Sequence, residues 1–376
     1  MIKEKVKILI LSNPANPHTI KWVKALDKKG FKIFVFGLSN YDKSVYENCK
    51  DVQAFSYGID ENLFIKSDGA FSKIVYLKAL KKLKQIISEF KPQILHSHYA
   101  TSYGLLGALS GFHPYIISAW GSDVYDFPKK SFLHRSILKY NLGNADKILS
   151  TSKVMAEEVQ IYTGKEIIIT PFGIDTEVFK PQETKSLFDH KDIVIGTVKT
   201  LEANYGIENL IRAFKIVKES NPLLLLKLLI VGTGSQELYL KKVVSELGLE
   251  KIATFTGFIL PDDIPRYHNM ITVPVFLSQH ESFGVAVLEA LACEKPVIVT
   301  NVDGFKEIVQ DGINGIIVPV GDVEKTAAAI EKLIKDKNLR LDLGKKGREQ
   351  VIEFYNWKNN ILQMVKIYSD LLNPGN

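Results

Sequence analysis

Residues 6–37 read VKILILSNPANPHTIKWVKALDKKGFKIFVFG and contain two short apolar runs separated by a helical segment. The apolar runs are Val6–Leu11 and Phe31–Gly37, and the segment His18–Lys29 between them ends at Gly30, a residue type that commonly follows the end of a helix. This order predicts a strand, a helix and a second strand. Because the apolar runs are continuous rather than alternating, both strands should be covered on two faces, as in a parallel sheet.

The same alternation of apolar runs and helical segments continues along the chain in two series. The first series adds strands at Ile94–His98, Tyr115–Ala119, Lys147–Ser150 and Ile167–Thr170. The second begins near residue 192, with helices at Ile207–Glu219 and Gln236–Leu247 and strands at Ile193–Val198, Leu224–Val231, Ala253–Thr256, Ile271–Phe276, Pro296–Thr300 and Gly315–Val318. Each series predicts its own parallel sheet.

A polar segment from Lys180 to Ser186 has no periodicity and predicts a linker between the two series. The fold class is therefore α/β, with two Rossmann-like doubly wound domains facing an interdomain cleft. We expect an N-terminal domain at 1–182 and a C-terminal domain at 183–350. A long last helix, about Lys345–Leu372, predicts that residues 351–376 return to the N-terminal domain. Ligands of open parallel sheets bind at the carboxyl ends of the strands, so the cleft is the expected site.

Composition bounds the possible classes of protein. The chain has 376 residues, 46% of them hydrophobic and 24% charged, which excludes disordered, collagen-like and coiled-coil chains. Two cysteines, Cys49 and Cys293, cannot form a disulfide framework, and this fits a reducing cytoplasm. No apolar run approaches the roughly 20 residues of a membrane span, and the N-terminal run is too short for a secretory signal. We therefore expect a cytoplasmic protein.

The charge is unevenly distributed. Residues 1–180 carry 25 Lys and Arg against 17 Asp and Glu, a net charge of +8, whereas residues 181–376 carry 23 against 25, a net charge of −2. The basic excess therefore belongs to the first half of the chain.

The most informative motif is SQHESFGVAVLEALACEKPVIVT at residues 278–300. It follows an apolar strand, and its segment Phe283–Cys293 predicts a helix whose N-terminal amides suit an anion. Glu281 just before this helix and Glu289 within it can both accept hydrogen bonds from hydroxyl groups. This combination suits a nucleotide-sugar. The same two glutamates are also typical of an ordinary surface helix, with one acidic residue favoured at the N-terminus.

The wider pattern resembles the retaining glycosyltransferases of family 4, which have the two-domain GT-B fold. The motif at 278–300 and the segment GFKEIVQDGINGIIVP at residues 304–319 are similar to the donor-binding signature of that family. Further similar segments are PFGIDTEVFKP at 171–181, GTVKTLEANYGI at 196–207, VGTG at 231–234 and FTGF at 255–258.

The resemblance implies roles for residues of the second domain. Glu281 would hold the donor sugar, and Lys199 would be the cation for the diphosphate, as a lysine where many members have arginine. Glu289 would bind the ribose. Tyr205 stands where many members have a second lysine and is counted with the donor-binding residues. The remaining donor-binding positions are Phe283, Gly284, Val285 and Ala286, whose backbone amides would frame the diphosphate, and Gly232 and Phe258, which would approach the nucleoside.

Candidate acceptor or cleft residues in the first domain follow the predicted strands. Asn16 lies in the proline-stiffened turn after the first strand, and an ordinary turn is the alternative. His98 and Tyr99 end another strand and are candidates for sugar contact; without a third ligand, a metal site at His96 and His98 is disfavoured.

Two further candidates follow the next strand. Trp120 stands where the family commonly has a histidine, and its ring could stack on a sugar or its N–H could donate. Asp123 would bond an acceptor hydroxyl or cap the next helix.

The function that the resemblance implies is transfer of a hexose from a nucleotide-sugar to a saccharide or lipid-linked saccharide, with retention of the anomeric configuration. Cell-surface polysaccharide or glycolipid synthesis is the expected setting. The chain has no D-x-D triplet, so we expect a metal-independent enzyme without a required cofactor. A UDP-, GDP- or ADP-sugar would be the co-substrate. Two alternatives remain, a sugar-nucleotide epimerase or hydrolase of the same fold and a non-catalytic nucleotide-sugar-binding partner.

The segment Phe71–Phe90 predicts an amphipathic helix. Its apolar side chains are Val75, Leu80, Leu83, Ile86, Ile87 and Phe90, and its opposite face carries Lys73, Lys78, Lys81, Lys82 and Lys84. One interpretation is adhesion to an anionic membrane surface, which would place the enzyme at the inner face of the cell membrane near a lipid-linked acceptor. The alternative is a helix that packs on its sheet and exposes its lysines to water. No recognition motif accompanies the charge, so we expect no nucleic-acid partner.

Overall fold

The computed structural model describes residues 5–59 and 70–373, with the backbone alone for residues 70–77. Its internal contacts divide the chain into two units. Unit 1 comprises the residues up to Phe172 and those from Asn359 onward, and unit 2 is Gly173–Lys358. This division differs by ten and by eight residues from the boundaries after 182 and after 350 that the sequence predicts. Those boundaries stay predictions.

Unit 1 contains a seven-stranded sheet with the strand order β3-β2-β1-β4-β5-β6-β7, and all its pairs are parallel. Its strands are β1 (Lys7–Leu11), β2 (Lys32–Ser39), β3 (Val52–Ile59), β4 (Ile94–His98), β5 (Tyr115–Ala119), β6 (Lys147–Ser150) and β7 (Ile167–Ile169). The order reverses between β1 and β4, as in doubly wound folds. Successive side chains of a strand point to opposite faces, so Leu9 and Leu95 pack on one side of the sheet and His96 faces the other.

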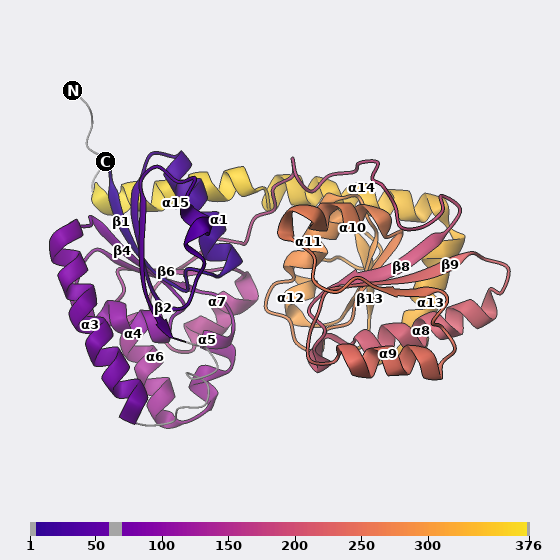
Figure 1. The fold of residues 1–376 in the computed structure, drawn as a ribbon, viewed down its shortest axis with the longest axis horizontal. Helices are drawn as coiled ribbons and strands as arrows, with labels where there is room; N and C mark the ends of the chain where they lie inside the picture. The colour runs from indigo at the N-terminus through magenta and orange to yellow at the C-terminus, as the bar shows by residue number, and fades with distance from the viewer. Residues whose placement is uncertain (1–4, 60–69, 374–376) are drawn as a thin grey trace. The chain divides into compact units, whose positions relative to one another are not determined.

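Helices cover both faces of this sheet (Figure 1). The helices of unit 1 are α1 (Pro17–Lys28), η1 (Lys43–Tyr46), α3 (Ala70–Phe90), α4 (Ser102–Ser110), α5 (Ser122–Tyr125), η2 (Phe127–Lys129), α6 (Phe132–Asn144), α7 (Lys153–Gln160) and most of α15 (Trp357–Leu372). Helices α3, α4 and α6 pack against one another along one face.

Unit 2 repeats the same plan with a six-stranded parallel sheet of order β10-β9-β8-β11-β12-β13. Its strands are β8 (Ile193–Val198), β9 (Leu226–Val231), β10 (Ala253–Phe255), β11 (Val273–Phe276), β12 (Val297–Thr300) and β13 (Gly315–Val318). Here the order reverses between β8 and β11. The prediction of two parallel-sheet α/β domains is confirmed.

Helices also flank the sheet of unit 2 on both sides (Figure 1). They are η3 (Ala203–Tyr205), α8 (Ile207–Ser220), α9 (Glu237–Glu246), η4 (Pro261–Asp263), α10 (Ile264–Met270), α11 (Val285–Ala292), α12 (Asp303–Lys306), α13 (Val323–Lys335) and α14 (Lys337–Phe354). Helices α8, α9 and α13 form one layer, while α10, α11 and α14 pack together.

Three local predictions were wrong. The sequence indicates a helix from Phe283, but α11 begins at Val285 because Gly284 adopts a φ of 95°, outside the helical region. Strand β3 was not predicted, since its residues alternate with polar ones at the sheet edge and form no continuous apolar run. The expected single helix at Lys345–Leu372 is two helices, α14 and α15.

The break between α14 and α15 has a local cause. The backbone of Ile174 accepts from the N–H of Trp357 and donates to the carbonyl of Tyr355, so a distant segment takes over these backbone groups. The side chain of Asn356 accepts from the N–H of Lys358 at 2.9 Å and starts α15 as an N-cap does. The bridge between Ile174 and Asn356 joins segments far apart in the sequence, so helical periodicity cannot predict it.

Helix α15 contributes directly to the core of unit 1. The hydroxyl of Tyr368 lies 2.8 Å from Nδ1 of His96 on β4, and Tyr368 is 1% exposed. The amide of Gln363 donates to the carbonyl of Ile169 at 2.8 Å, at the end of β7. Two strands of the unit 1 sheet therefore depend on the last helix of the chain for polar partners.

Over the part whose side chains are described, helix α3 presents its apolar side chains to the protein and most of its lysines to water. Leu83, Ile86 and Phe90 are buried, whereas Lys78, Lys81 and Lys84 are exposed. Lys82 departs from the predicted exposed face, because it is half-buried and its ammonium lies 5.4 Å from the centre of the Phe55 ring. Val75 and Lys73 lie outside the described side chains. Within residues 5–59 and 70–373, no helix is both long and apolar enough to cross a membrane.

The core of unit 2 allows a matched stability test. We expect Leu333→Ala on α13, at a fully buried side chain, to lower the free energy of unfolding by about 2–5 kcal/mol, since it leaves a cavity. Leu341→Ala on α14 changes a side chain that is 61% exposed and should cost at most about 0.5 kcal/mol. Urea unfolding measures both values, and equal losses for the two variants would contradict the packing described here.

Candidate active site

The loops that follow β8 and β11 lie where the strand order of unit 2 reverses. At such a point the connections after two neighbouring strands leave to opposite faces of the sheet, which opens a space above the strand ends. Lys199 directly follows β8 and Glu281 lies in the loop after β11. Their side chains form an ion pair, with Nζ of Lys199 2.6 Å from Oε2 of Glu281. The two side chains are 17% and 13% exposed, so the pair is partly shielded but reachable.

Two neighbours hold this ion pair. The Ser278 hydroxyl donates to Oε2 of Glu281 at 3.4 Å. The ammonium of Lys199 lies 4.2 Å from the centre of the Tyr205 ring, within the range of a cation–π contact. The structure thus brings together three of the residues singled out in the sequence, namely Lys199, Tyr205 and Glu281.

The loop between Glu281 and α11 is fixed by a close backbone contact. Gly304 on α12 lies so near this loop that a Cβ atom there would sit 2.3 Å from the carbonyl oxygen of Glu281. The Phe283 side chain is 2% exposed, and those of Val285 and Ala286 are half-buried. A ligand at this place would therefore meet the backbone of Phe283 rather than its ring. Gly304 was quoted in the sequence motif without a role, and its contact depends on the tertiary fold.

Glu289 has a partner that sequence reasoning missed. Nε2 of His268 on α10 lies 3.2 Å from Oε2 of Glu289 on α11. The imidazole of His268 is fully buried, and its Nδ1 has no hydrogen-bond partner among the described residues. If Nε2 carries the proton, the ring donates to Glu289 and orients its carboxylate. The side chain of Glu289 itself is 19% exposed, so it remains accessible to a ligand hydroxyl.

Gly232 and Phe258 follow β9 and β10, the next two strands of the sheet. A bridge between Gly232 and Gly257 joins the two loops in antiparallel fashion. Phe258 is 71% exposed, an unusual degree for a large apolar side chain. All residues proposed from the sequence for the donor therefore follow the carboxyl ends of strands in unit 2 or lie on α11.

The candidates of unit 1 lie in an aromatic cluster at its strand ends. The rings of His98 and Trp120 are 4.4 Å apart between centroids, and His18 stacks on Phe172 at 4.0 Å. Tyr99 contacts the edge of Trp120 at 6.0 Å. His98 is 2% and Trp120 is 9% exposed, so both lie largely inside this cluster. Phe172 and His18 also join this cluster, and no sequence pattern predicted their contact.

Asp123 and Asn16 use their side chains for backbone contacts within unit 1. Asp123 is 2% exposed, and its carboxylate accepts from the N–H groups of Ala100 at 2.7 Å, Gly121 at 2.7 Å and Trp120 at 3.2 Å. It therefore joins the loops after β4 and β5. Asn16 accepts from the N–H of His18 at 2.9 Å and caps α1.

Burial keeps the histidines of this cluster neutral. It lowers the pKa of His96 to about 3. Burial and the nearby charge of Lys21 lower the pKa of His18 to about 4. Burial, with His96 and His18 as neighbours, lowers the pKa of His98 well below its ordinary value. At neutral pH these rings can serve as hydrogen-bond partners but carry no charge.

In the part of the chain that the structure describes, no group of three or more His, Cys, Asp or Glu side chains is arranged to hold a metal ion.

Comparisons with known proteins agree with this architecture. The family model described as Glycosyl transferases group 1 matches residues 178–350, and the one described as Glycosyl transferase 4-like matches residues 7–152. An uncharacterized glycosyltransferase of Methanocaldococcus jannaschii is 29% identical over 306 residues, which cover 80% of this chain and 82% of that protein.

Solved structures share the fold along nearly the whole chain. Sucrose-phosphate synthase from Thermosynechococcus elongatus has a TM-score of 0.80 at 21% identity, with 99% of this chain and 100% of that chain covered. HepE from Anabaena, solved in complex with UDP-glucose, has a TM-score of 0.77 at 19% identity, with 97% and 100% covered.

Fold and family models together define a glycosyltransferase of the GT-B type. Within that class, residues 178–350 match the glycosyl transferases group 1 model and residues 7–152 match the glycosyl transferase 4-like model, so the two models describe different parts of the chain. The resemblance found in the sequence is thereby confirmed.

The buried histidines predict a pH dependence of stability. Their folded pKa values lie below the ordinary value of about 6.5, so below that pH the unfolded chain binds more protons than the folded one. Stability should therefore fall as the pH drops from 6.5 toward 4, by up to about 1.4 kcal/mol per pH unit for each ring. His98→Asn should reduce the slope of the free energy of unfolding against pH by the contribution of one ring, up to about 1.4 kcal/mol per pH unit. Urea unfolding at pH 7, 6 and 5 measures it.

The control is His190→Asn in unit 2, where the histidine side chain is 82% exposed. It should leave the slope unchanged. An identical slope in the wild-type protein and the His98 variant would show that His98 takes up a proton in the folded state.

Proposed function

We propose that this glycosyltransferase transfers a hexose from a nucleotide-sugar to a saccharide or lipid-linked saccharide, retains the anomeric configuration and needs no metal ion. The observation that carries the proposal is the Lys199–Glu281 ion pair at the point of strand-order reversal in unit 2. The ammonium of Lys199 suits a diphosphate, and the carboxylate of Glu281 suits the hydroxyls of a sugar. The UDP-glucose complex of HepE, a protein of the same fold, supports a nucleotide-sugar as the co-substrate.

Donor binding would exchange the partners of this ion pair. The diphosphate takes the Lys199 ammonium, which with the amides at the start of α11 offsets the charge of the leaving group. Glu281, released from Lys199, accepts hydrogen bonds from hydroxyls of the sugar. Glu289, held by His268, accepts from the ribose hydroxyls. The loops of Gly232 and Phe258 lie beside the nucleoside. UDP-, GDP- and ADP-sugars are the candidate donors.

The reaction is a substitution at the anomeric carbon on one face of the sugar. The bond between this carbon and the diphosphate oxygen breaks, and the acceptor oxygen attacks from the same side. The acceptor hydroxyl passes its proton to the leaving diphosphate. Lys199 lowers the energy of the developing negative charge throughout, because the ammonium is already in place before the bond breaks.

Unit 1 would supply the acceptor side. Tyr99 is a half-exposed member of the aromatic cluster and offers a ring and a hydroxyl to a sugar. His98 and Trp120 would set the position of Tyr99 from beneath, since both are largely buried. Asp123 and Asn16 would hold the surrounding loops through their backbone contacts. Synthesis of a cell-surface polysaccharide or glycolipid is the proposed setting, in the cytoplasm.

Removal of the ion pair tests the proposed function. Lys199→Ala and Glu281→Ala should each lower kcat/KM for sugar transfer by about a hundredfold or more, since each removes charge stabilisation at the reacting centre. Because the two groups act on one donor, the double variant should be little worse than the weaker single variant. Release of nucleoside diphosphate from UDP-, GDP- and ADP-sugars, measured with an acceptor mixture, gives the rates.

Lys242→Ala is the matched control, because Lys242 forms an exposed pair with Glu246 on α9 at 3.6 Å. It should keep full activity. Wild-type rates in either active-site variant, with circular dichroism unchanged, would refute the proposed roles of Lys199 and Glu281.

We further propose that α3 adheres to an anionic membrane surface. Lys78, Lys81 and Lys84 are exposed on this helix. Each lysine near an anionic surface contributes about 1 kcal/mol to binding, so Lys81→Glu with Lys84→Glu should weaken binding about thirtyfold or more. Co-sedimentation with phosphatidylglycerol-containing vesicles at low salt measures it. Lys29→Glu with Lys139→Glu, at exposed positions elsewhere in unit 1, is the control. Equal binding of the two double variants to the vesicles would show that α3 is not the membrane contact.

A further inference from the structure

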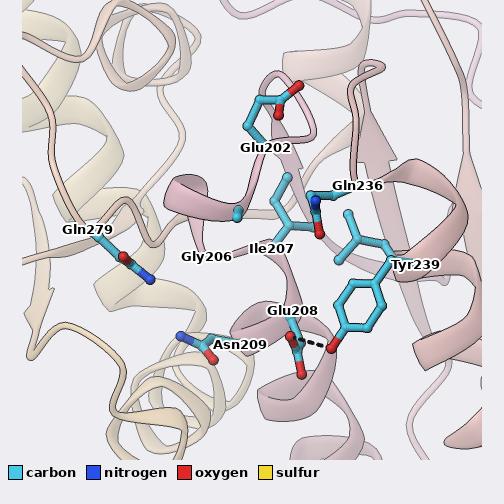
Figure 2. Close-up of a pocket in the computed structure, with 10 residues that line it drawn as sticks. Glu202, Gly206, Ile207, Glu208, Asn209, Gln236, Tyr239 and Gln279 are labelled. Atoms are coloured by element: carbon cyan, nitrogen blue, oxygen red, sulfur yellow. Dashed lines mark hydrogen bonds between the residues drawn. The ribbon is translucent and has the colours of Figure 1, made fainter.

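A surface pocket of unit 2 lies beside the donor residues but is built from other side chains. It opens between the start of α8, the start of α9 and the loop after β11 (Figure 2). Its polar lining consists of Glu202, Glu208, Asn209, Gln236, Tyr239 and Gln279. Neither Lys199, Glu281 nor Glu289 belongs to the lining. The function proposed above therefore leaves this pocket unexplained.

Three primary amides of the pocket have no hydrogen-bond partner among the residues that the structure describes. They belong to Asn209 on α8, Gln236 before α9 and Gln279 after β11. Figure 2 shows the side chains of Gln279 and Asn209 directed toward each other, while Gln236 lies on the other side of Ile207, near Tyr239. The backbone of Gln279 is fixed, since its N–H donates to the carbonyl of Asn204 at 2.8 Å. Each amide offers donors and an acceptor together, which is the requirement for binding hydroxyl groups that also donate and accept.

Tyr239 adds an aromatic surface in a fixed position. Its hydroxyl donates to Oε2 of Glu208 at 2.9 Å, and Glu208 is also paired with Arg212 at 2.8 Å. Burial alone would raise the pKa of Glu208. The hydrogen bonds from Arg212 and Tyr239 nevertheless hold this pKa below its ordinary value. The residue Tyr239 is 46% exposed, so it can pack against the C–H face of a sugar ring.

Glu202 sets the charge of the pocket. Its carboxylate accepts from the N–H of Ser235 at 2.8 Å and from the Ser235 hydroxyl, and these bonds lower the pKa of Glu202. Unlike Glu208, it has no cationic partner among the described side chains. A phosphate or another carboxylate would meet this negative charge, whereas a hydroxyl or an ammonium group would be favoured by it.

From these contacts we propose that the pocket binds a neutral or amine-bearing saccharide unit, and that this unit belongs to the acceptor. The location supports the second part. Gly206 and Gln279 line the pocket, and they lie in the same two loops that carry Lys199 and Glu281. The pocket and the proposed reacting centre therefore share two loops. Its assignment as the acceptor rests on the proposed function, while saccharide binding does not.

A glycan array tests the binding directly. The full chain is applied to an array of neutral, amine-bearing and acidic oligosaccharides, and the strongest neutral or amine-bearing hit is then titrated by calorimetry. Asn209→Leu with Gln236→Leu removes two amides, so affinity should fall about tenfold, given roughly 0.5–1.5 kcal/mol for each lost hydrogen bond. Acceptor-free hydrolysis of the nucleotide-sugar should stay unchanged in this variant, since neither residue touches the proposed donor site.

Asn359→Leu with Gln310→Leu is the matched control, at exposed positions outside the pocket. It should bind as the wild-type protein does. The proposal is overturned if no oligosaccharide binds, if acidic glycans bind best, or if the pocket variant binds as well as the control. Failure of the proposed function gives a different result, namely no release of nucleoside diphosphate by the wild-type protein from any of the three nucleotide-sugar types.

Discussion

The reversal of strand order in each sheet is the constraint on which the rest of the structure depends. In a parallel sheet every connection must cross over a face, and two neighbouring strands whose connections cross opposite faces leave a gap above their carboxyl ends. In unit 2 this gap lies between β8 and β11. Charged groups can stand there without being buried in the core, because the loops rather than the strands carry them. Lys199 and Glu281 occupy these two loops.

A partly buried ion pair at such a place is better explained by function than by stability. Removing two charges from water costs free energy that their attraction only partly offsets, so apolar residues would stabilise the same position at least as well. The Lys199–Glu281 pair is held at 2.6 Å while both side chains keep some exposure. The contact orients both side chains before a ligand arrives. In the proposed function, a bound diphosphate would replace one charged partner with another, which would limit the cost of rearrangement.

Short sequence patterns were sufficient to predict the elements whose formation depends on neighbouring residues in the chain. Short apolar runs predicted β5 and β8 to the residue, because these strands are buried on both faces. The proximity of Lys199 and Glu281 depends on the pairing of β8 with β11, which the order of elements along the chain does not reveal. The contact of His268 with Glu289 could not be predicted, because it depends on how α10 packs on α11. Edge strand β3 was not predicted either, because its half-exposed residues form no continuous apolar run.

Tyr205 shows how a substitution in a shared motif can change the way a charge is held. Members that resemble this chain commonly carry a second lysine there, and two ammonium groups side by side repel each other until a diphosphate binds. Here the Tyr205 ring lies 4.2 Å from the Lys199 ammonium and attracts it through its π face. The site therefore has one cation that is already positioned, rather than two that a ligand must bring together. Less charge is available for the diphosphate, and less rearrangement is needed to use it.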